Sequence, residues 1–323
     1  MNLVLFSRLR NRTRRISRFH GVFLLLFCSG IANFPLWSGQ EKKISLTFDH
    51  LPAVAPFGYW RPREVSSTIL RVLESHDIKA AGFVVEEKID DDPSTYIVLE
   101  DWALRGHILG NQTYSNVDLN QLNTEDFLHH VVDGQKYLRR VSRVHRFSFR
   151  YLRFPYLHEG DTQRKKREVA KILYNNGYTV APVTVKTSDH LFNEPYLANE
   201  RADGGIRRLK AIYLEHVGKS LEYAENQSVK IFSCNISHIL QLHCGLATAH
   251  FLDDLIEMLK RRGYEFISFT EALSDPAFQT EENYAGSFGL SFIDRVAATN
   301  GYSFDEKHGE LTREEIEKRL ITH

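Results

Sequence analysis

The chain has 323 residues, of which 42% are hydrophobic and 25% charged, and it holds 41 Lys and Arg against 41 Asp and Glu. A chain of this length can bury a full hydrophobic core, as one large domain or two medium ones. The balanced charge excludes a broad basic surface of the kind that grips phosphates, so we expect no nucleic-acid partner.

Residues 1–40 have the composition of an export signal. They hold six arginines and no acidic residue, which leaves 35 Lys and Arg against 41 Asp and Glu in the remainder, and they include the apolar run Gly21–Ala32. This run is shorter than the roughly 20 residues that a membrane helix needs. Thr13–Phe19 resembles a twin-arginine signal, and Leu26–Cys28 loosely resembles a lipoprotein cleavage box. We therefore predict a signal peptide or N-terminal anchor at 1–40. The protein would be periplasmic, extracellular or envelope-associated, and would contact a membrane only through that segment if it stays uncleaved.

Strands and helices alternate along the rest of the chain. Apolar patterning predicts strands at Ile44–Phe48, Ala80–Val85, His107–Gly110, Tyr151–Arg153, Thr179–Val185, His238–His243 and Tyr264–Phe269. Helices are predicted between them: one opening at Pro62, one after Pro93, one from Thr124 to Leu138, one ended by Gly177, one from Tyr196 to Glu225, and one closed by Gly263. About seven β/α repeats without a long linker favour one parallel sheet with helices outside it.

The pattern is compatible with either a closed barrel or an open doubly wound sheet. Residues 41–275 are predicted to form this α/β domain. Residues 276–323 are interpreted as a C-terminal extension, because they hold too few apolar positions for a core of their own. Within the extension, Arg313–Leu320 is predicted to be a solvent-facing helix.

Polar side chains gather where five of the predicted strands end. The segments are Thr47–His50, Gly110–Asn116, Arg153–Tyr156, Thr187–His190 and Leu242–His243. In parallel α/β folds the carboxyl ends of the strands carry the functional site. Taken singly, Asp49 also fits a helix cap, Gln112 and Asn116 fit loop amides, and His243 fits a buried structural histidine. The repetition at successive strand ends favours a site.

In this order and spacing, the five segments resemble the polysaccharide deacetylase family, the NodB-type carbohydrate esterases. The resemblance runs from about Ile44 to Ala272 and includes Leu46–Asp49 and Gly110–Leu119. It implies a distorted (β/α)7 barrel. It also implies a hydrolase that removes acetyl groups from acetylated carbohydrates, cleaving a carbon–nitrogen bond in N-acetylated sugars.

The resemblance further implies roles for the residues that match the family. It implies Asp49 as the catalytic base, Arg153 as the residue that orients this base, His243 as the general acid, Asp189 as the carboxylate paired with that acid, the Tyr156 backbone N–H as the oxyanion donor, and Leu242 as the wall beside the acetyl methyl group.

The family also implies a divalent metal, often zinc, held by one Asp and two His. Here His50, Gln112 and Asn116 stand at those three positions. Zinc prefers imidazole, thiolate or carboxylate ligands, and neutral amides bind it poorly. The exchanged set also loses the negative charge that offsets the ion, so we expect an affinity several orders of magnitude lower.

Two main hypotheses follow from this combination. The first is a hydrolase that binds metal through His50 and a neighbour such as His158 or His190, or that works without metal through Asp49 and His243. The second is a catalytically inactive carbohydrate-binding protein that keeps the groove and has lost the chemistry. A purely structural envelope protein is the third reading.

Overall fold

The fold is described from a computed structural model covering residues 41–58, 60–201 and 203–321. The predicted signal or anchor at 1–40 lies outside this described part. The strands are β1 (Lys42–Leu51), β2 (Ala81–Val84), β3 (Ile108–Asn111), β4 (Tyr151–Leu152), β5 (Thr179–Val180), β6 (His238–His243) and β7 (Tyr264–Phe266). No helix of the described residues combines the length and hydropathy that crossing a membrane takes.

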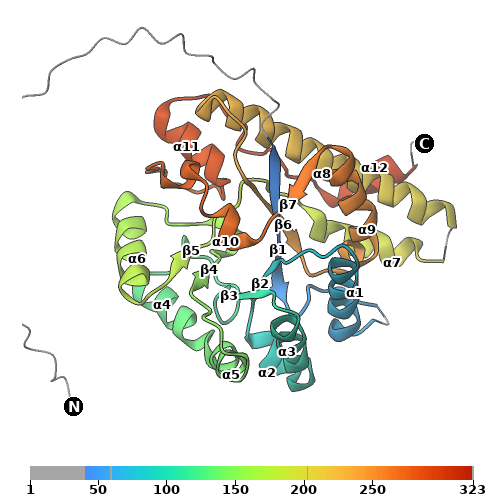
Figure 1. The fold of residues 1–323 in the computed structure, drawn as a ribbon, viewed down its shortest axis with the longest axis horizontal. Helices are drawn as coiled ribbons and strands as arrows, with labels where there is room; N and C mark the ends of the chain where they lie inside the picture. Colours follow the sequence, from blue (N-terminus) through green and yellow to red (C-terminus); the bar gives the residue numbers. More distant parts are fainter. Residues whose placement is uncertain (1–40, 59, 202, 322–323) are drawn as a thin grey trace, which may run out of the picture. The chain divides into compact units, whose positions relative to one another are not determined.

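Helices surround the strands (Figure 1). They are α1 (Pro62–Ser75), α2 (Glu87–Asp91), α3 (Tyr96–Leu104), α4 (Thr124–Asp133), α5 (Lys136–His145), α6 (Gln163–Asn175), α7 (Asn193–Asn199), α8 (Asp203–Phe232), α9 (Leu246–Arg261), α10 (Phe269–Ala272), α11 (Phe292–Asn300) and α12 (Arg313–Ile321). Short 3-10 turns include η2 (Pro155–Leu157) and η3 (Asp189–Phe192). The alternation predicted from the sequence is therefore the alternation of the fold.

All seven strands belong to one parallel sheet, in the order β5-β4-β3-β2-β1-β6, with β7 paired to the first residues of β1. The sheet curls so far that the chain after β5 reaches β6, where Val185 and Leu240 form a parallel bridge. Gln241 N–H donates to the Val185 carbonyl at 3.0 Å. This curled parallel sheet with outer helices is the distorted (β/α)7 type that the resemblance implied.

Alternation along the strands separates an inner from an outer layer. One buried cluster contains Phe83, Tyr151, Ile239 and Phe269, and fills the inside of the curl away from the strand ends. A much larger cluster lies between the sheet and the helices and includes Leu242. Successive strand residues point to opposite faces of the sheet. The inward-facing residues are apolar in the middle of the curl, and those at the carboxyl ends of the strands are polar.

The structure corrects three predicted elements. The helix predicted from Thr124 to Leu138 is two helices, because the loop before it reaches into the break: Tyr114 N–H donates to the His130 carbonyl at 2.8 Å. The strand predicted over 179–185 ends at Val180, and Pro182 follows it without an N–H to donate. The helix predicted from Tyr196 is interrupted at residues 200–201, before Gly204 and Gly205, and then continues to Phe232.

The C-terminal extension packs on the barrel. Residues 40–323 form one compact unit, with the whole sheet and its buried clusters. Phe292, Ile293 and Val296 of α11 are buried, and the α12 helix, predicted to face solvent, buries Ile316 completely. Lys166 and Arg295 share Glu282, at 2.5 and 3.1 Å, which ties α11 to α6.

Candidate functional site

A pocket of about 340 Å³ opens at the carboxyl ends of β1, β3, β4 and β6. Five of the nine residues predicted for the site line it: Asp49, His50, Gln112, Tyr156 and His243. Arg153 and Asp189 are buried directly behind them, each bonded or paired to a lining residue. Asn116 and Leu242 are not among its lining residues. Seven of the nine predicted residues therefore lie in or directly behind one pocket.

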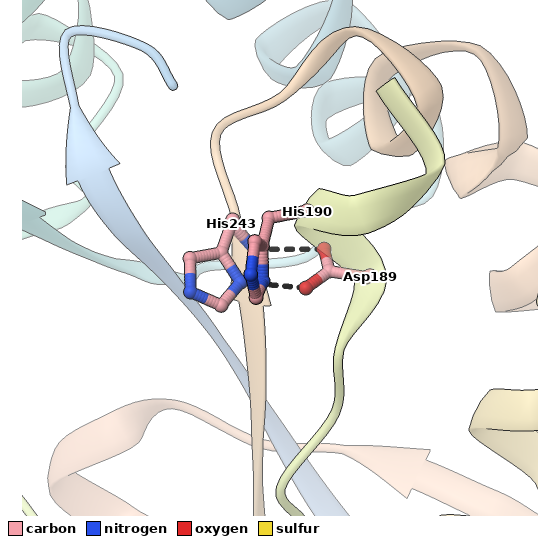
Figure 2. A group of neighbouring side chains, drawn as sticks. All are labelled: Asp189, His190 and His243. Atoms are coloured by element: carbon pink, nitrogen blue, oxygen red, sulfur yellow. Dashed lines mark hydrogen bonds and ion pairs between the residues drawn. The ribbon is translucent and has the colours of Figure 1, made fainter. Parts of the chain in front are cut away.

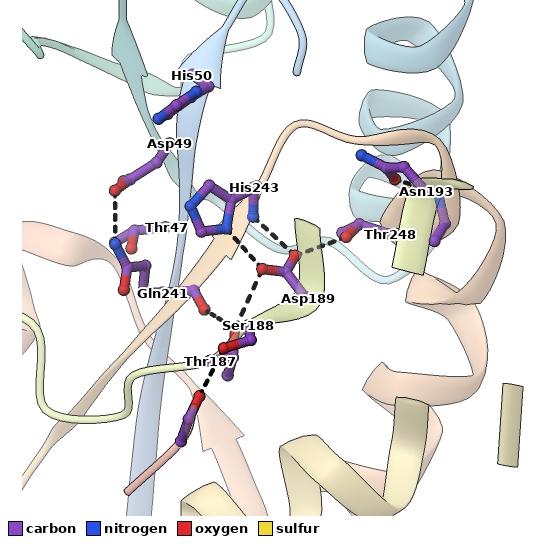
Figure 3. Close-up of polar contacts among 12 residues, drawn as sticks. Thr47, Asp49, His50, Thr187, Ser188, Asp189, Asn193, Gln241, His243 and Thr248 are labelled. Atoms are coloured by element: carbon purple, nitrogen blue, oxygen red, sulfur yellow. Dashed lines mark hydrogen bonds and ion pairs between the residues drawn. The ribbon is translucent and has the colours of Figure 1, made fainter. Parts of the chain in front are cut away.

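Asp49 is a buried carboxylate surrounded by donors. One oxygen, Oδ2, accepts from Gln241 Nε2 at 2.7 Å (Figure 3). The same oxygen accepts from Gln112 Nε2 at 3.2 Å. The other, Oδ1, lies 3.4 Å from the Nε of Arg153. Only 1% of the surface of Asp49 is exposed, so these three side chains stand around its carboxylate in place of water.

Arg153 holds this arrangement from behind. Its guanidinium is fully buried and donates to the Pro182 carbonyl and to Thr47 Oγ1, both at 3.0 Å. It also lies over the Phe83 ring, 4.5 Å from the centroid. These contacts fix the guanidinium of Arg153 beside the Asp49 carboxylate.

Asp189 and His243 form a second buried pair. His243 Nδ1 donates to Asp189 Oδ1 at 2.6 Å, and the His243 backbone N–H donates to Oδ2 at 2.8 Å (Figures 2 and 3). The Thr248 hydroxyl donates to the same carboxylate at 2.7 Å, while the Thr187 hydroxyl, 3.2 Å from Oδ1, donates at 2.8 Å to the Gln241 carbonyl. Asp189 therefore has three donors and a fixed orientation.

The pair perturbs both acid–base equilibria. Burial alone would raise the pKa of Asp189, but His243 and the donated hydrogen bonds outweigh it and lower the pKa to about 2. Burial alone would lower the pKa of His243, but the Asp189 charge and hydrogen bond raise it above its usual value. A protonated His243 facing the pocket is a competent proton donor.

Gln112 occupies the place between β1 and β3 where the resemblance puts a metal ligand. Its Oε1 accepts from the His50 backbone N–H at 2.7 Å, while its Nε2 donates to Asp49. Turning the amide over would set its nitrogen against an N–H and its oxygen against a carboxylate. The one atom of Gln112 that can bind a metal therefore already accepts a hydrogen bond from the His50 backbone.

His50 and Asn116 do not make up for this. His50 has a left-handed backbone (φ 67°), and its ring centroid lies 5.3 Å from that of His243. Burial and then the charges of His243 and Lys88 lower the pKa of His50 well below its usual value, so it is a neutral imidazole. Asn116 Oδ1 is buried without a hydrogen-bond partner in the described residues but lies outside the pocket lining. One free imidazole and two amides do not fit a tight zinc site.

The other two histidines that line the pocket, His158 and His190, have different neighbours. His158 Nδ1 bonds Asp118 at 2.8 Å, and the His190 ring stands 4.6 Å from that of His243 (Figure 2). Within the described residues, Asp189, His190 and His243 form a group whose ligand atoms lie within 4.8 Å. Two of those three already bond each other, so we assign no metal to them.

Gln241 lines the pocket although no sequence pattern predicted it, whereas Leu242, predicted as the wall beside an acetyl methyl group, does not line it. The side chain of Leu242 is fully buried in the cluster between sheet and helices. Gln241 and His243 pair with Thr47 and Asp49 across the sheet and point inward with them. The period-2 alternation of β6 was the available signal, because it places residue 241, and not 242, on the face of His243.

Tyr156 lies at a strained turn that the extension supports. Its backbone is left-handed (φ 57°), which carries its side chain outward to 60% exposure. Gly289 packs on its carbonyl so closely that a Cβ there would overlap the oxygen. Lys186 Nζ donates to the Gly289 carbonyl at 3.3 Å and pairs with Glu310 at 3.2 Å. The extension thus supplies one wall of the pocket.

Comparison with known proteins agrees with this geometry. Residues 38–181 match the family model described as polysaccharide deacetylase. A peptidoglycan-N-acetylglucosamine deacetylase from Bacillus cereus is 26% identical over 117 residues, which is 36% of this chain and 37% of that protein. A chitin deacetylase from Colletotrichum lindemuthianum is 24% identical over 246 residues, covering 73% of this chain and 81% of that protein.

The solved structure of the Colletotrichum lindemuthianum chitin deacetylase has the same fold. It superposes with a TM-score of 0.51 over 73% of this chain and 89% of that one, at 23% identity. The family-model match, these relatives and the curled parallel sheet agree with one another. Residues 38–181 of this chain therefore carry the sequence pattern of the polysaccharide deacetylase family, on a fold of the same type.

Proposed function

We propose that this protein binds acetylated glycans of the chitin or peptidoglycan kind in the pocket at its strand ends, without a tightly bound zinc ion. One observation carries the proposal: the Gln112 amide joins His50 to Asp49 where a metal would have to enter. The match of residues 38–181 to the polysaccharide deacetylase family model supports a carbohydrate ligand. Export through residues 1–40 remains a prediction from the sequence and would place this activity outside the cytoplasm.

The pocket suits a sugar because it presents donors and acceptors in fixed places. The Gln241 and Gln112 amides, the imidazoles and the Lys186 ammonium surround a concave space of about 340 Å³. Preorganised polar groups in a concave site bind a hydroxylated, amide-bearing ligand without a large ordering cost.

Metal content and glycan binding test the proposal together. Purified protein is incubated with zinc and dialysed, and bound metal is counted by mass spectrometry. Calorimetry then measures binding of chito-oligosaccharides and of peptidoglycan fragments. We expect well under one zinc per chain together with measurable glycan binding. Near-stoichiometric zinc would overturn the metal-free part, and absence of binding to either glycan would overturn the glycan part.

The Asp189–His243 pair favours a second candidate, hydrolysis of the acetyl group without metal. Water would attack the acetyl carbonyl, Asp49 would take its proton, and His243 would protonate the leaving amine as the carbon–nitrogen bond breaks. Loss of a Lewis acid raises the barrier by several kcal/mol, so an acetyl ester is a better substrate than an amide. Acetate release that persists in EDTA and disappears in His243→Gln would support this candidate over binding alone.

A triple variant tests the placement of the three substituted positions. His50→Asp, Gln112→His and Asn116→His together restore one carboxylate and two imidazoles, and return the negative charge. We expect this variant to retain zinc after dialysis where the natural chain does not. Failure to retain zinc, in a variant that unfolds cooperatively, would mean that the three positions do not converge on one ion.

A further inference from the structure

The C-terminal extension reaches the rim of the strand-end pocket at two separate places. Gly289 lines the pocket in the segment before α11, and Gly309 and Glu310 line it in the segment before α12. Lys186, which follows β5, contacts both segments: its ammonium donates to the Gly289 carbonyl at 3.3 Å and pairs with Glu310 at 3.2 Å. The two segments and Lys186 therefore form one continuous wall.

The segment before α11 is fixed to the loops after β3 and β4. Arg295 of α11 pairs with Glu159 at 2.9 Å, and the two side chains are only 5% and 13% exposed, so water screens this pair little. The Gly286 N–H donates to the Gly160 carbonyl at 3.2 Å, and Asn120 Nδ2 donates to the Gly286 carbonyl at 3.0 Å. These contacts make the segment a fixed part of the rim.

The segment before α12 is fixed on the other side of the pocket. Ser188 Oγ donates to the Gly309 carbonyl at 2.9 Å and accepts from the Leu311 N–H at 3.2 Å. Gly309 has a left-handed backbone (φ 75°) and lies so close to the Lys186 carbonyl that a Cβ would overlap it. Ile316 of α12, a few residues further, is fully buried in the main core. The segment is therefore held from both ends.

The lining of the pocket follows the ring of strands and leaves one side without a wall. β1, β3 and β6 each contribute lining residues, and so do η2 and the segment 186–190. The extension lies between η2 and this segment, because Gly289 packs on the Tyr156 carbonyl and also binds Lys186. Among the described residues, β2 and the chain from Val85 to Lys88 contribute no lining residue. The pocket is therefore closed sideways except toward β2.

A pocket with one lateral opening limits which part of a glycan can enter it. A sugar inside a long chain needs an opening on each side, because the chain continues in both directions. A sugar at the end of a chain needs only one. The volume of about 340 Å³ also lies near the lower limit of the roughly 300–1,000 Å³ that ligand pockets span. Both features favour a chain end.

We propose that the pocket binds the terminal sugar of a glycan chain, and that the C-terminal extension excludes the interior of a long chain. This inference rests on the glycan binding proposed above and specifies which part of the glycan is bound.

The length dependence of binding tests the inference. Calorimetry on the full chain compares chito-oligosaccharides, and peptidoglycan strands, of increasing length. We expect a hexasaccharide to bind within about twofold of the disaccharide, because the additional sugars lie outside the pocket. An affinity that rises with every added sugar would overturn the inference and leave the proposed function in place. Absence of binding at every length would overturn the proposed function, and the inference with it.

A bulky tag separates end binding from interior binding. A fluorophore is attached to one terminus or to the other of a hexasaccharide that binds. The tag on the terminus that enters the pocket should weaken binding by about tenfold or more, because the closed pocket has no room for it, and the tag on the opposite terminus should have no effect. A glycan bound by its interior would tolerate both tags, and this result would contradict end binding.

A paired variant tests whether the extension forms the wall. Lys186→Ala with Glu310→Ala removes both members of the ion pair and releases the Gly289 carbonyl. The affinity for the hexasaccharide should then rise several-fold relative to that for the disaccharide. Loss of a direct contact between Lys186 and the sugar would weaken both ligands equally, so this ratio reports the wall and not the contact.

Lys210→Ala with Asp254→Ala is the matched control for the paired variant. These residues form a similar pair, 2.9 Å apart, between α8 and α9, and neither of them lines the pocket. The ratio of the two affinities should stay as in the natural chain. An unchanged ratio in the first variant, or an equal rise in both variants, would overturn the assignment of the wall to the extension.

Discussion

Asp49, in β1, and Asp189, in η3, are both buried carboxylates, and their partners differ in kind. Asp49 meets two amides and one arginine, a set that cannot lose a proton at neutral pH. Asp189 meets a histidine, whose charge depends on pH. A change in pH across the neutral range therefore acts on Asp189 through His243, while the partners of Asp49 keep their charge.

Replacing Asp189 by Asn should destabilise the protein by about 3–5 kcal/mol at pH 6, because His243 would be left charged and buried without its partner. The raised pKa of His243 means that its protonated form stabilises the fold below about pH 6.5, and that this contribution is lost as pH rises through the folded value. The loss caused by Asp189→Asn should therefore be smaller at pH 9. Urea unfolding at both pH values measures it.

Asp253→Asn is the matched control for this experiment. Asp253 pairs with His76 at 2.8 Å, as Asp189 does with His243, but its side chain is 65% exposed. Water screens such a surface pair, so its removal should cost no more than about 1 kcal/mol. Equal losses in the two variants would contradict a special role for burial at Asp189.

Residues could be assigned to the site from the sequence only where they lie at a predicted strand end or match the family pattern. Asp49, His50, Gln112, Tyr156 and His243 line one pocket, as five strand-end segments indicated. Gln241 was not predicted because a single glutamine between two leucines carries no motif, although its spacing from His243 placed it on the inner face. The hydrogen bonds that occupy Gln112 depend on its rotamer, which no sequence pattern specifies.

At the scale of elements, α5 begins on a buried acid. Glu86, just after β2, is fully buried and accepts the backbone N–H groups of Tyr137 and Leu138 at 2.8–3.0 Å. Helix N-termini favour a negative charge. Burial opposes that charge and raises the pKa of Glu86 to about 7, and the donated N–H groups only partly offset it.

Glu86→Gln should change how stability depends on pH. The pKa of Glu86 is about 7 in the folded protein and about 4.3 in the unfolded chain, so the folded state holds the proton more tightly. The contribution of Glu86 to stability therefore declines as pH rises from about 4.3 to 7. We expect the natural chain to lose roughly 2–4 kcal/mol relative to the variant between pH 5 and pH 8. Unfolding free energies of both proteins at these pH values provide the test.

Glu125→Gln, an exposed change on α4, gives the baseline for this comparison. The unfolding free energies of the natural chain and of Glu86→Gln could instead change with pH in the same way. That result would show that Glu86 is ionised in the folded protein over the whole range.

The break between α4 and α5 positions Gln112, and Gly134 makes it possible. A Cβ on Gly134 would lie 2.8 Å from the backbone of Thr113 and Tyr114, in the loop that follows Gln112. Periodicity predicted one continuous helix here, because the apolar positions of both helices follow the same spacing. Only the approach of the loop, which is a tertiary contact, separates them.

Gly134→Ala should push this loop away, cost about 1–3 kcal/mol of stability and weaken glycan binding by shifting Gln112. Gly204→Ala is the control, because Gly204 lies in α8 with nothing within 4 Å of a Cβ, and alanine there should stabilise by up to about 1 kcal/mol. Unfolding and calorimetry on both variants measure the effect. Unchanged glycan binding in a destabilised Gly134→Ala protein would separate the loop from the site.

On the scale of the whole molecule, the extension that looked peripheral in the sequence is part of the barrel. Its apolar residues are few, but Ile316 reaches the main core and Gly309 lies against the Lys186 carbonyl at the pocket. Counting apolar positions underestimated the segment, because it completes a core that the barrel provides rather than building its own.

Ile316→Ala therefore probes whether the extension and the barrel unfold together. Removing a fully buried isoleucine should cost about 2–5 kcal/mol, and the loss should appear as an earlier, still single transition followed by fluorescence and circular dichroism. Ile321→Ala, on the same helix but 83% exposed, should change stability by no more than about 0.5 kcal/mol. Two separate transitions in Ile316→Ala, or equal effects of the two variants, would mean that α12 folds on the barrel as an independent appendage. In that case the pocket wall at Gly309 and Glu310 would come loose without unfolding the barrel, and glycan binding would weaken at denaturant concentrations where the barrel is still intact.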